Sequence, residues 1–255
     1  MTIEASNRPR RLIRPLMLVV AALMTISLAG VTARTALAAT TNRHYLSAAR
    51  SADVLRTAFG VVSEHPIRVP QVVVAPTSAA TWALSDDVNM ANQAWNPRTA
   101  RTWAHGDAQA MWPAGMGGFT DPTTGTVYVN AQNAVESNVP HELLHANASP
   151  DFLQSIGVAI NEGVTEQLAL DAMAGSGLAV EKVPAYPQER ALADAIVKLT
   201  GRDRLLQAYF NGGSHVADFI AAIGADTLAQ VKNAAAGNGV AAALAVVESV
   251  VPSGR

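Results

Sequence analysis

The chain of 255 residues contains no cysteine. This absence excludes a disulfide framework, but it leaves the compartment open because many exported bacterial proteins also lack cysteine. Charged residues are scarce as well, at 15%, whereas 49% of the residues are hydrophobic. A chain of this length and composition can bury one sizeable core. Because it shows neither an internal repeat nor a low-complexity linker, we predict a single domain, residues 39–255, after an N-terminal leader.

The leader has the pattern of a secretory signal peptide. A start rich in arginine precedes the apolar run Leu16–Leu28, and Ala36-Leu37-Ala38 offers a small-x-small cleavage site. We therefore predict that residues 1–38 form a signal peptide and that the protein is secreted or extracytoplasmic. The alternative is an uncleaved membrane anchor, because the 19 uncharged residues between Arg14 and Arg34 can span a bilayer. The rest of the chain would face outside in both cases.

The charge balance argues against nucleic acid as a partner. The whole chain carries 18 basic and 20 acidic residues. Removing residues 1–38 takes away five basic residues and Glu4, which leaves 13 basic and 19 acidic residues and a net charge of −6. A mildly acidic domain lacks the basic patch that a phosphate backbone requires.

His141, Glu142 and His145 stand together in the pattern His-Glu-x-x-His. The preceding segment 137–140 offers two capping residues and a proline that a first helical turn tolerates, so the pattern is expected to open a helix. Histidines four positions apart lie on one helical face, where both imidazoles can bind the same metal ion. Glu142 then lies beside that metal, where it can take a proton from a water molecule.

Two acidic residues follow, Glu162 and Glu166, in the pattern Asn-Glu-Gly-x-x-Glu. Pro150 marks the end of the first helix, and apolar residues at helical spacing predict one continuous second helix from 152 to 173. Both glutamates lie on one face of it. Glu162 can serve as the third metal ligand, while Glu166 can accept the free N–H of a ligating histidine. Three protein ligands with a fourth position open are typical of a catalytic zinc site.

These two patterns together resemble the gluzincin branch of the zincin metallopeptidases, which includes thermolysin-like and aminopeptidase-like enzymes. The resemblance covers residues 137–173 and implies that His141, His145 and Glu162 bind Zn²⁺. It also implies that Glu142 is the general base and that Glu166 supports the site from outside the ligand set. The fold expected from it is α+β and zincin-like: a small mixed sheet with an edge hairpin, then the active-site helix, the second ligand helix and an alanine-rich helical C-terminal half.

The same residues allow other interpretations. The metzincin pattern places a glycine and a further ligand where this chain has Ala148 and Asp151, so Asp151 is a conceivable ligand but the glycine of the turn is missing. Peptide deformylases need a cysteine ligand, and intramembrane zinc proteases need several apolar spans. The remaining alternative is that the two histidines and two glutamates are solvated residues on surface helices.

The expected domain has three parts: an α/β part at 39–136, the metal-site helices at 137–175 and a helical part at 176–255. In the first part we predict helices at 45–62 and 78–84, a strand at 68–75 and a loop with helical turns at 86–105. A hairpin of 116–119 and 126–130 surrounds a loop with strong turn chemistry, Asp121 to Gly125. Helices of the last part are predicted at about 188–199, 203–210, 215–223, 227–234 and 240–251. Residues 39–62 are either a propeptide or the first helix.

The resemblance implies further roles in substrate binding. In zincins a sheet edge beside the active-site helix binds the peptide as an added strand, and we assign this role to one of the two hairpin strands; the alternative is an ordinary hairpin that closes the sheet. A Tyr or His commonly stabilises the oxyanion. The candidates for that donor are Tyr186, Tyr209 and His215. His44, His65 and His105 lack any partner pattern and are expected at the surface.

We therefore expect an exported zinc-dependent metallopeptidase that hydrolyses peptide bonds and acts as a monomer on a peptide or protein substrate. Contact with a membrane is expected only if the leader is not cleaved. The alternative is a non-catalytic zincin-fold module that holds a peptide in the same groove, although binding alone has no need of Glu142.

Overall fold

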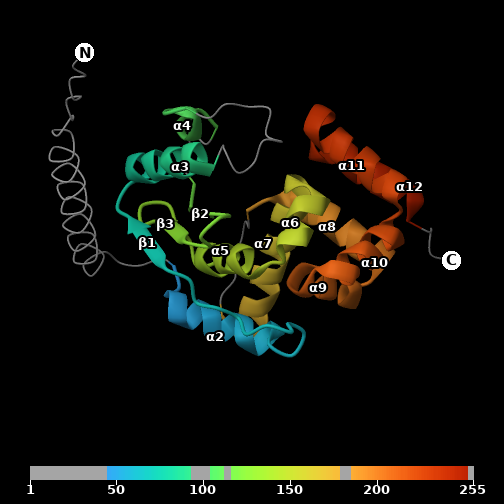
Figure 1. Ribbon diagram of the computed structural model, residues 1–255, viewed down its shortest axis with the longest axis horizontal. Helices are drawn as coiled ribbons and strands as arrows, with labels where there is room; N and C mark the ends of the chain where they lie inside the picture. The colour runs from blue at the N-terminus through green and yellow to red at the C-terminus, as the bar shows by residue number, and fades with distance from the viewer. Residues whose placement is uncertain (1–44, 93–103, 112–115, 179–184, 252–255) are drawn as a thin grey trace, which may run out of the picture. The chain divides into compact units, whose positions relative to one another are not determined.

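The computed structural model describes residues 45–92, 104–111, 116–178 and 185–251, all within a compact unit that covers residues 43–255. The predicted signal peptide and His44 lie outside the described residues. No described helix combines the length and the apolar content that a membrane crossing requires. Figure 1 shows the sheet and the C-terminal helices on opposite sides of two central helices, α5 and α7.

Three short strands form a mixed sheet: β1 (Val72–Ala75), β2 (Gly118–Thr120) and β3 (Val127–Asn130). Their order is β1-β3-β2, with β1 parallel and β2 antiparallel to the central strand β3. The β2–β3 pair is the predicted hairpin, and its turn is built on Asp121. The main-chain N–H of Asp121 donates to the carbonyl of Thr126, and the carbonyl of Asp121 accepts the N–H of Gly125. The hairpin prediction is thus confirmed, and β3 lies between the other two strands.

Alternation along the strands gives each face of the hairpin a different environment. Val127 and Val129 of β3 are fully buried, so their face points into the core. On the other face, Tyr128 stacks on Phe119 of β2 with ring centroids 4.6 Å apart. The register pairs Thr120 with Val127 and Gly118 with Val129, which places both β2 residues on the core side, toward α5.

Eleven helices accompany the sheet in the described part of the chain. The first three are α2 (Ala48–Phe59), α3 (Ser78–Asn92) and α4 (Asp107–Met111). The middle three are α5 (Asn138–Asn147), α6 (Pro150–Ile156) and α7 (Val158–Gly175). The last five are α8 (Pro187–Thr200), α9 (Arg202–Asn211), α10 (Gly213–Ile223), α11 (Ala225–Asn238) and α12 (Val240–Val250). Each predicted C-terminal helix is present, within a few residues of its predicted bounds.

The core is built around α5, which packs against α2, α7 and the hairpin. Helix α2 contributes Leu55, which is fully buried, and Phe59, which is 3% exposed and lies beside Phe210. At the C-terminal end of α5, the side-chain amide of Asn147 accepts the N–H of Arg68 and donates to its C=O, which holds the segment leading to β1 in place. Helix α2 thus forms part of the core, where it packs against α5 and α7.

Two element predictions differ from the structure. The predicted helix 78–84 is longer than expected, because α3 continues to Asn92, into the segment predicted as a loop with helical turns; residues 93–103 of that segment lie outside the described residues, and the short helix α4 after it had not been predicted. The predicted continuous helix 152–173 is broken into α6 and α7 at Gly157, which has a φ of 91°. Lys232 of α11 reaches this break and donates to the carbonyl of Ser155, so a contact distant in sequence holds the chain in the broken conformation.

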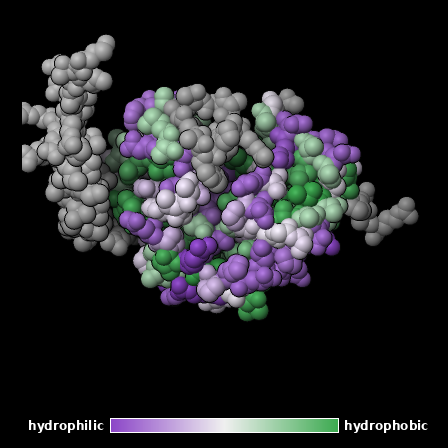
Figure 2. Space-filling view, viewed as in Figure 1, coloured by the Kyte–Doolittle hydropathy of each residue, from purple (hydrophilic) through white to green (hydrophobic). Residues whose placement is uncertain are grey.

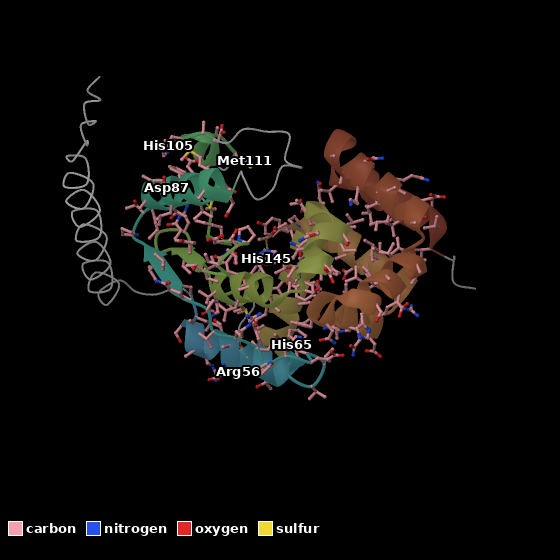
Figure 3. The ribbon with its side chains drawn as sticks, in the orientation of Figure 1. Arg56, His65, Asp87, His105, Met111 and His145 are labelled. Atoms are coloured by element: carbon pink, nitrogen blue, oxygen red, sulfur yellow. The ribbon has the colours of Figure 1, made fainter. Side chains whose placement is uncertain are left out.

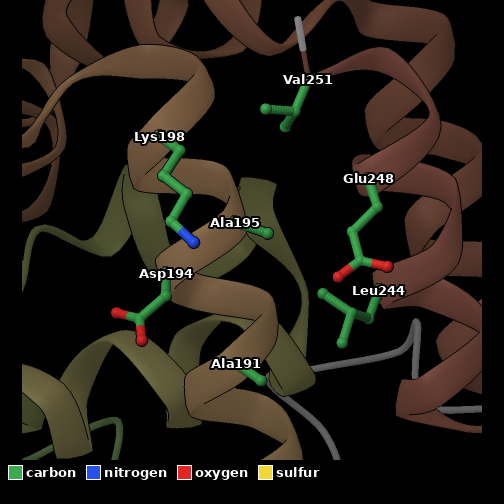
Figure 4. Close-up of a pocket in the computed structure, with 7 residues that line it drawn as sticks. All are labelled: Ala191, Asp194, Ala195, Lys198, Leu244, Glu248 and Val251. Atoms are coloured by element: carbon green, nitrogen blue, oxygen red, sulfur yellow. The ribbon is translucent and has the colours of Figure 1, made fainter. Parts of the chain in front are cut away.

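A groove of about 400 Å³ lies between α8 and α12, away from the residues singled out by the sequence (Figure 4). Asp194 and Lys198 stand on the α8 side and Glu248 on the α12 side, around an apolar floor. Apolar surface also gathers near these helices in Figure 2, whereas polar residues cover much of the rest of that view.

Candidate metal centre

The His-Glu-x-x-His residues lie on α5, which begins where the sequence predicted. Ser137 stands at the N-cap position without a capping side-chain bond, and Pro140 lies in the first turn. His141 and Glu142 are nearly buried, with 3% and 6% of their surface exposed. Figure 3 shows His145 near the middle of the molecule, while His65 and His105, both exposed, lie toward its margins.

Three potential ligand atoms converge from α5 and α7. Nε2 of His141 and Nε2 of His145 face each other 3.0 Å apart. Oε2 of Glu162 lies 3.3 Å from the first and 3.5 Å from the second. Within the described residues, this is the group of three or more His, Cys, Asp or Glu side chains that could hold a metal ion. Each residue offers one donor atom to a common point.

Glu166 and Asn161 hold the outer nitrogens of the two imidazoles. Oε2 of Glu166 lies 2.9 Å from Nδ1 of His141, so a proton on Nδ1 leaves Nε2 free as a metal ligand. The side-chain nitrogen of Asn161 lies 3.3 Å from Nδ1 of His145. The buried Oδ1 of the same amide has no hydrogen-bond partner among the described residues. Turning this amide over would present Oδ1 as the acceptor that His145 needs when its Nε2 binds a metal.

The buried charges at this site favour a cation. Burial lowers the pKa of His141, but hydrogen bonds with Glu162 and Glu166 outweigh burial and raise it to about 10. Burial raises the pKa of Glu162, but the two histidines outweigh it and hold the pKa well below its usual range. Burial also raises the pKa of Glu142, partly offset by the same histidines. Without a metal, a protonated histidine supplies the positive charge that the carboxylates require.

Glu142 lies between the His141–His145–Glu162 group and strand β2. Oγ1 of Thr120 is 2.8 Å from Oε2 of Glu142 and 2.9 Å from its main-chain oxygen. The sequence did not identify Thr120 as a site residue, because only the docking of the hairpin on α5 brings it there. Asn161 was also missed as a partner of His145, although its place next to Glu162 in the motif was a usable signal.

Of the three proposed oxyanion donors, Tyr186 is the one that lies at this site. Its ring stacks on His141 with centroids 5.6 Å apart and an interplanar angle of 14°, and its hydroxyl interacts with Glu162. Partial burial and the nearby carboxylates raise the pKa of Tyr186, of which 37% remains exposed, so its phenol stays protonated and can donate. Tyr186 precedes α8 in a left-handed conformation with a φ of 54°.

Gly163 explains how the start of α8 comes so close to α7. A Cβ at this position would overlap the main chain of Glu189 and lie 2.9 Å from the nitrogen of Arg190. Because glycine has no side chain, the first turn of α8 can lie directly against α7 beside Glu162. That contact places Tyr186 over His141.

The other two donors and the alternative ligand lie elsewhere. Tyr209 is fully buried, with its hydroxyl 2.9 Å from that of Thr165. His215 is partly exposed near the start of α10, 3.7 Å from the carboxylate of Glu64. Asp151, the conceivable metzincin-type ligand, instead accepts the N–H of Gly213 at the start of α10. None of these residues belongs to the His141–His145–Glu162 group.

Comparisons with known proteins do not assign this chain to a family. The chain matches no protein-family model, no curated protein and no solved structure.

Proposed function

We propose that this protein is a zinc-dependent metallopeptidase of the gluzincin type. The observation that carries the proposal is the triangle formed by two Nε2 atoms and one carboxylate oxygen, with sides of 3.0, 3.3 and 3.5 Å. Tetrahedral zinc, with bonds of about 2.0–2.1 Å, separates its ligand atoms by about 3.3–3.4 Å. The three residues therefore fit Zn²⁺ in both donor type and spacing, and three protein ligands leave a fourth position for water or substrate.

The residues around the triangle have the groups that peptide hydrolysis requires. A bound Zn²⁺ would act as a Lewis acid that lowers the pKa of water and polarises the scissile carbonyl. Glu142 takes a proton from the attacking water and delivers it to the nitrogen of the leaving amine. Glu166 holds His141 in the tautomer that binds through Nε2. Tyr186 donates a hydrogen bond to the oxygen on which negative charge develops.

Strand β2 is the part of the hairpin that can receive the substrate. The central strand β3 is paired on both sides, whereas β2 pairs with β3 alone in the described sheet. Its core-facing residues Gly118 and Thr120 contact Glu142. An extended peptide added to this edge would lie along α5, with main-chain bonds that do not depend on its sequence. We assign the role of substrate strand partner to β2.

A peptidase assay with controlled metal tests the function. The purified protein should cleave an unstructured protein such as casein, lose activity with a chelator and recover it with stoichiometric Zn²⁺. Substrates blocked at either end would then separate internal from terminal cleavage. Zinc-loaded protein that binds casein fragments without cleaving them would instead support the non-catalytic binding module, and a rate unaffected by the chelator would contradict zinc catalysis.

Replacing Tyr186 by Phe should lower kcat/KM by about 100-fold, because one donor to the developing oxyanion is lost. Zinc content should not change, since Tyr186 supplies no ligand in the proposed set. Tyr209→Phe is the matched control: it removes a buried hydrogen bond to Thr165, costs about 1 kcal/mol of stability and keeps kcat/KM. Wild-type kcat/KM in Tyr186→Phe would exclude Tyr186 as the oxyanion donor.

A further inference from the structure

Thr120 is the last residue of β2 and makes two contacts with one residue of α5. Its Oγ1 lies 2.8 Å from Oε2 of Glu142 and 2.9 Å from the main-chain oxygen of Glu142. Thr120 is the residue that donates a hydrogen bond to this carboxylate in the described part of the chain. A single hydroxyl thus links the side chain of Glu142 to its own backbone.

Gly118, two residues earlier on the same face of β2, brings the strand close enough for this contact. A Cβ on Gly118 would lie 2.6 Å from the main-chain oxygen of Tyr128 and 3.2 Å from Cγ of Glu142. The missing side chain lets the strand lie against the aliphatic part of Glu142 while Thr120 holds its Oε2. The hydrogen bond from Thr120 therefore holds one carboxylate oxygen of Glu142, and Oε1 remains for a water molecule.

The turn that follows Thr120 keeps the strand end in place. Oδ1 of Asp121 accepts hydrogen bonds from the Asn92 amide at 3.0 Å and from the N–H of Thr123 at 2.9 Å. Its Oδ2 accepts one from the Thr124 hydroxyl at 2.6 Å. Asp121 is 8% exposed, and its bond to Asn92 ties the turn to the end of α3. Thr120 is thus presented by a rigid part of the fold, which precise positioning of a reactive group requires.

We propose that Thr120 is a positioning residue for Glu142, which holds Oε2 so that Oε1 is directed at the attacking water. This inference rests on the proposed peptidase function, because Glu142 must act as the base for its orientation to matter. A glutamate side chain has several rotatable bonds, and a loss of alignment of about 1 Å at a reacting group is enough to lower the rate strongly. The hydroxyl of Thr120 touches neither the substrate nor a ligand atom in this account, because a peptide added to β2 would pair with the main chain of the strand.

The test compares Thr120→Val, Thr120→Ser and the control Thr126→Val. Valine keeps the shape and strand preference of threonine but has no hydroxyl. Thr120→Val should lower kcat by about 10- to 100-fold, with KM and zinc content unchanged. Thr120→Ser, which keeps the hydroxyl, should restore most of kcat. Thr126→Val makes the same change in the same hairpin, where the hydroxyl bonds Thr124 among the described residues, and should keep the wild-type kcat.

Two kinetic results would overturn the proposal: wild-type kcat in Thr120→Val, or a Thr120→Ser variant no faster than Thr120→Val. A second measurement separates this failure from failure of the proposed function. If the wild-type protein binds zinc but cleaves nothing, the infrared carboxylate band of Glu142 is isolated by subtracting the spectrum of Glu142→Gln. That band should shift in Thr120→Val and return in Thr120→Ser. An unchanged band would show that Thr120 does not hold the carboxylate.

Discussion

Replacing Glu142 by Gln is expected to lower kcat by about 100- to 10,000-fold while one zinc ion stays bound. Glutamine has nearly the same shape, so it fits the space in which Glu142 is 6% exposed, and its carbonyl oxygen can still accept the hydrogen bond from Thr120. It cannot take a proton from water, and it supplies no ligand in the proposed set. The loss should therefore appear in turnover and not in metal content.

The matched control for this variant is Glu136→Gln, because Glu136 is exposed shortly before α5 and the substitution changes the charge by the same amount. The control should keep the wild-type kcat. Peptide cleavage by Glu142→Gln at the wild-type rate would show that another group is the base. Loss of zinc together with activity would instead mean that Glu142 stabilises the metal directly.

Replacing Glu162 by Ala should weaken zinc binding by about 100- to 1,000-fold, because the roughly 10–16 kcal/mol of a structural zinc site with four protein ligands is about 2.5–4 kcal/mol for each ligand. The Glu162 carboxylate is the one donor that α7 contributes to the triangle, at 3.3 and 3.5 Å from the two Nε2 atoms. Competition with a chromogenic chelator measures the change. The effect should exceed that of Glu166→Ala, for which a loss of about 10- to 100-fold is expected.

Glu166→Gln is the conservative companion, since its amide oxygen can still accept the N–H of His141. It should bind zinc better than Glu166→Ala, because removing the acceptor leaves a buried imidazole nitrogen without a partner. Equal losses in Glu162→Ala and Glu166→Ala would contradict the assignment of Glu162 as the third ligand.

Local spacing in the sequence was enough to predict the central geometry. His141 and His145 face one point because they are four apart on a helix, and Glu162 meets them because α7 runs back beside α5. Glu166, one turn after Glu162, lies 2.9 Å from His141 where a hydrogen bond was expected. The hairpin was predicted from its turn residues, and its register sets which side chains of β2 face α5.

The remaining features depend on contacts between distant segments, which periodicity does not reveal. The position of Tyr186 follows from the close packing of α8 on Gly163, and Thr120 reaches Glu142 only after the hairpin docks on α5. Gly157 was read as part of a continuous helix, but its positive φ and the reach of Lys232 produce a break. Each of these features depends on two elements that meet only in the folded chain.

The metal content of the purified protein tests the central claim most directly. After dialysis against buffer with limited zinc, elemental analysis should find about one zinc ion per chain, and His145→Ala should lose it while remaining folded. The result depends only on the triangle of His141, His145 and Glu162, and it requires no knowledge of the substrate. A folded, zinc-supplemented sample without bound metal would contradict the proposal that these three residues form a zinc site.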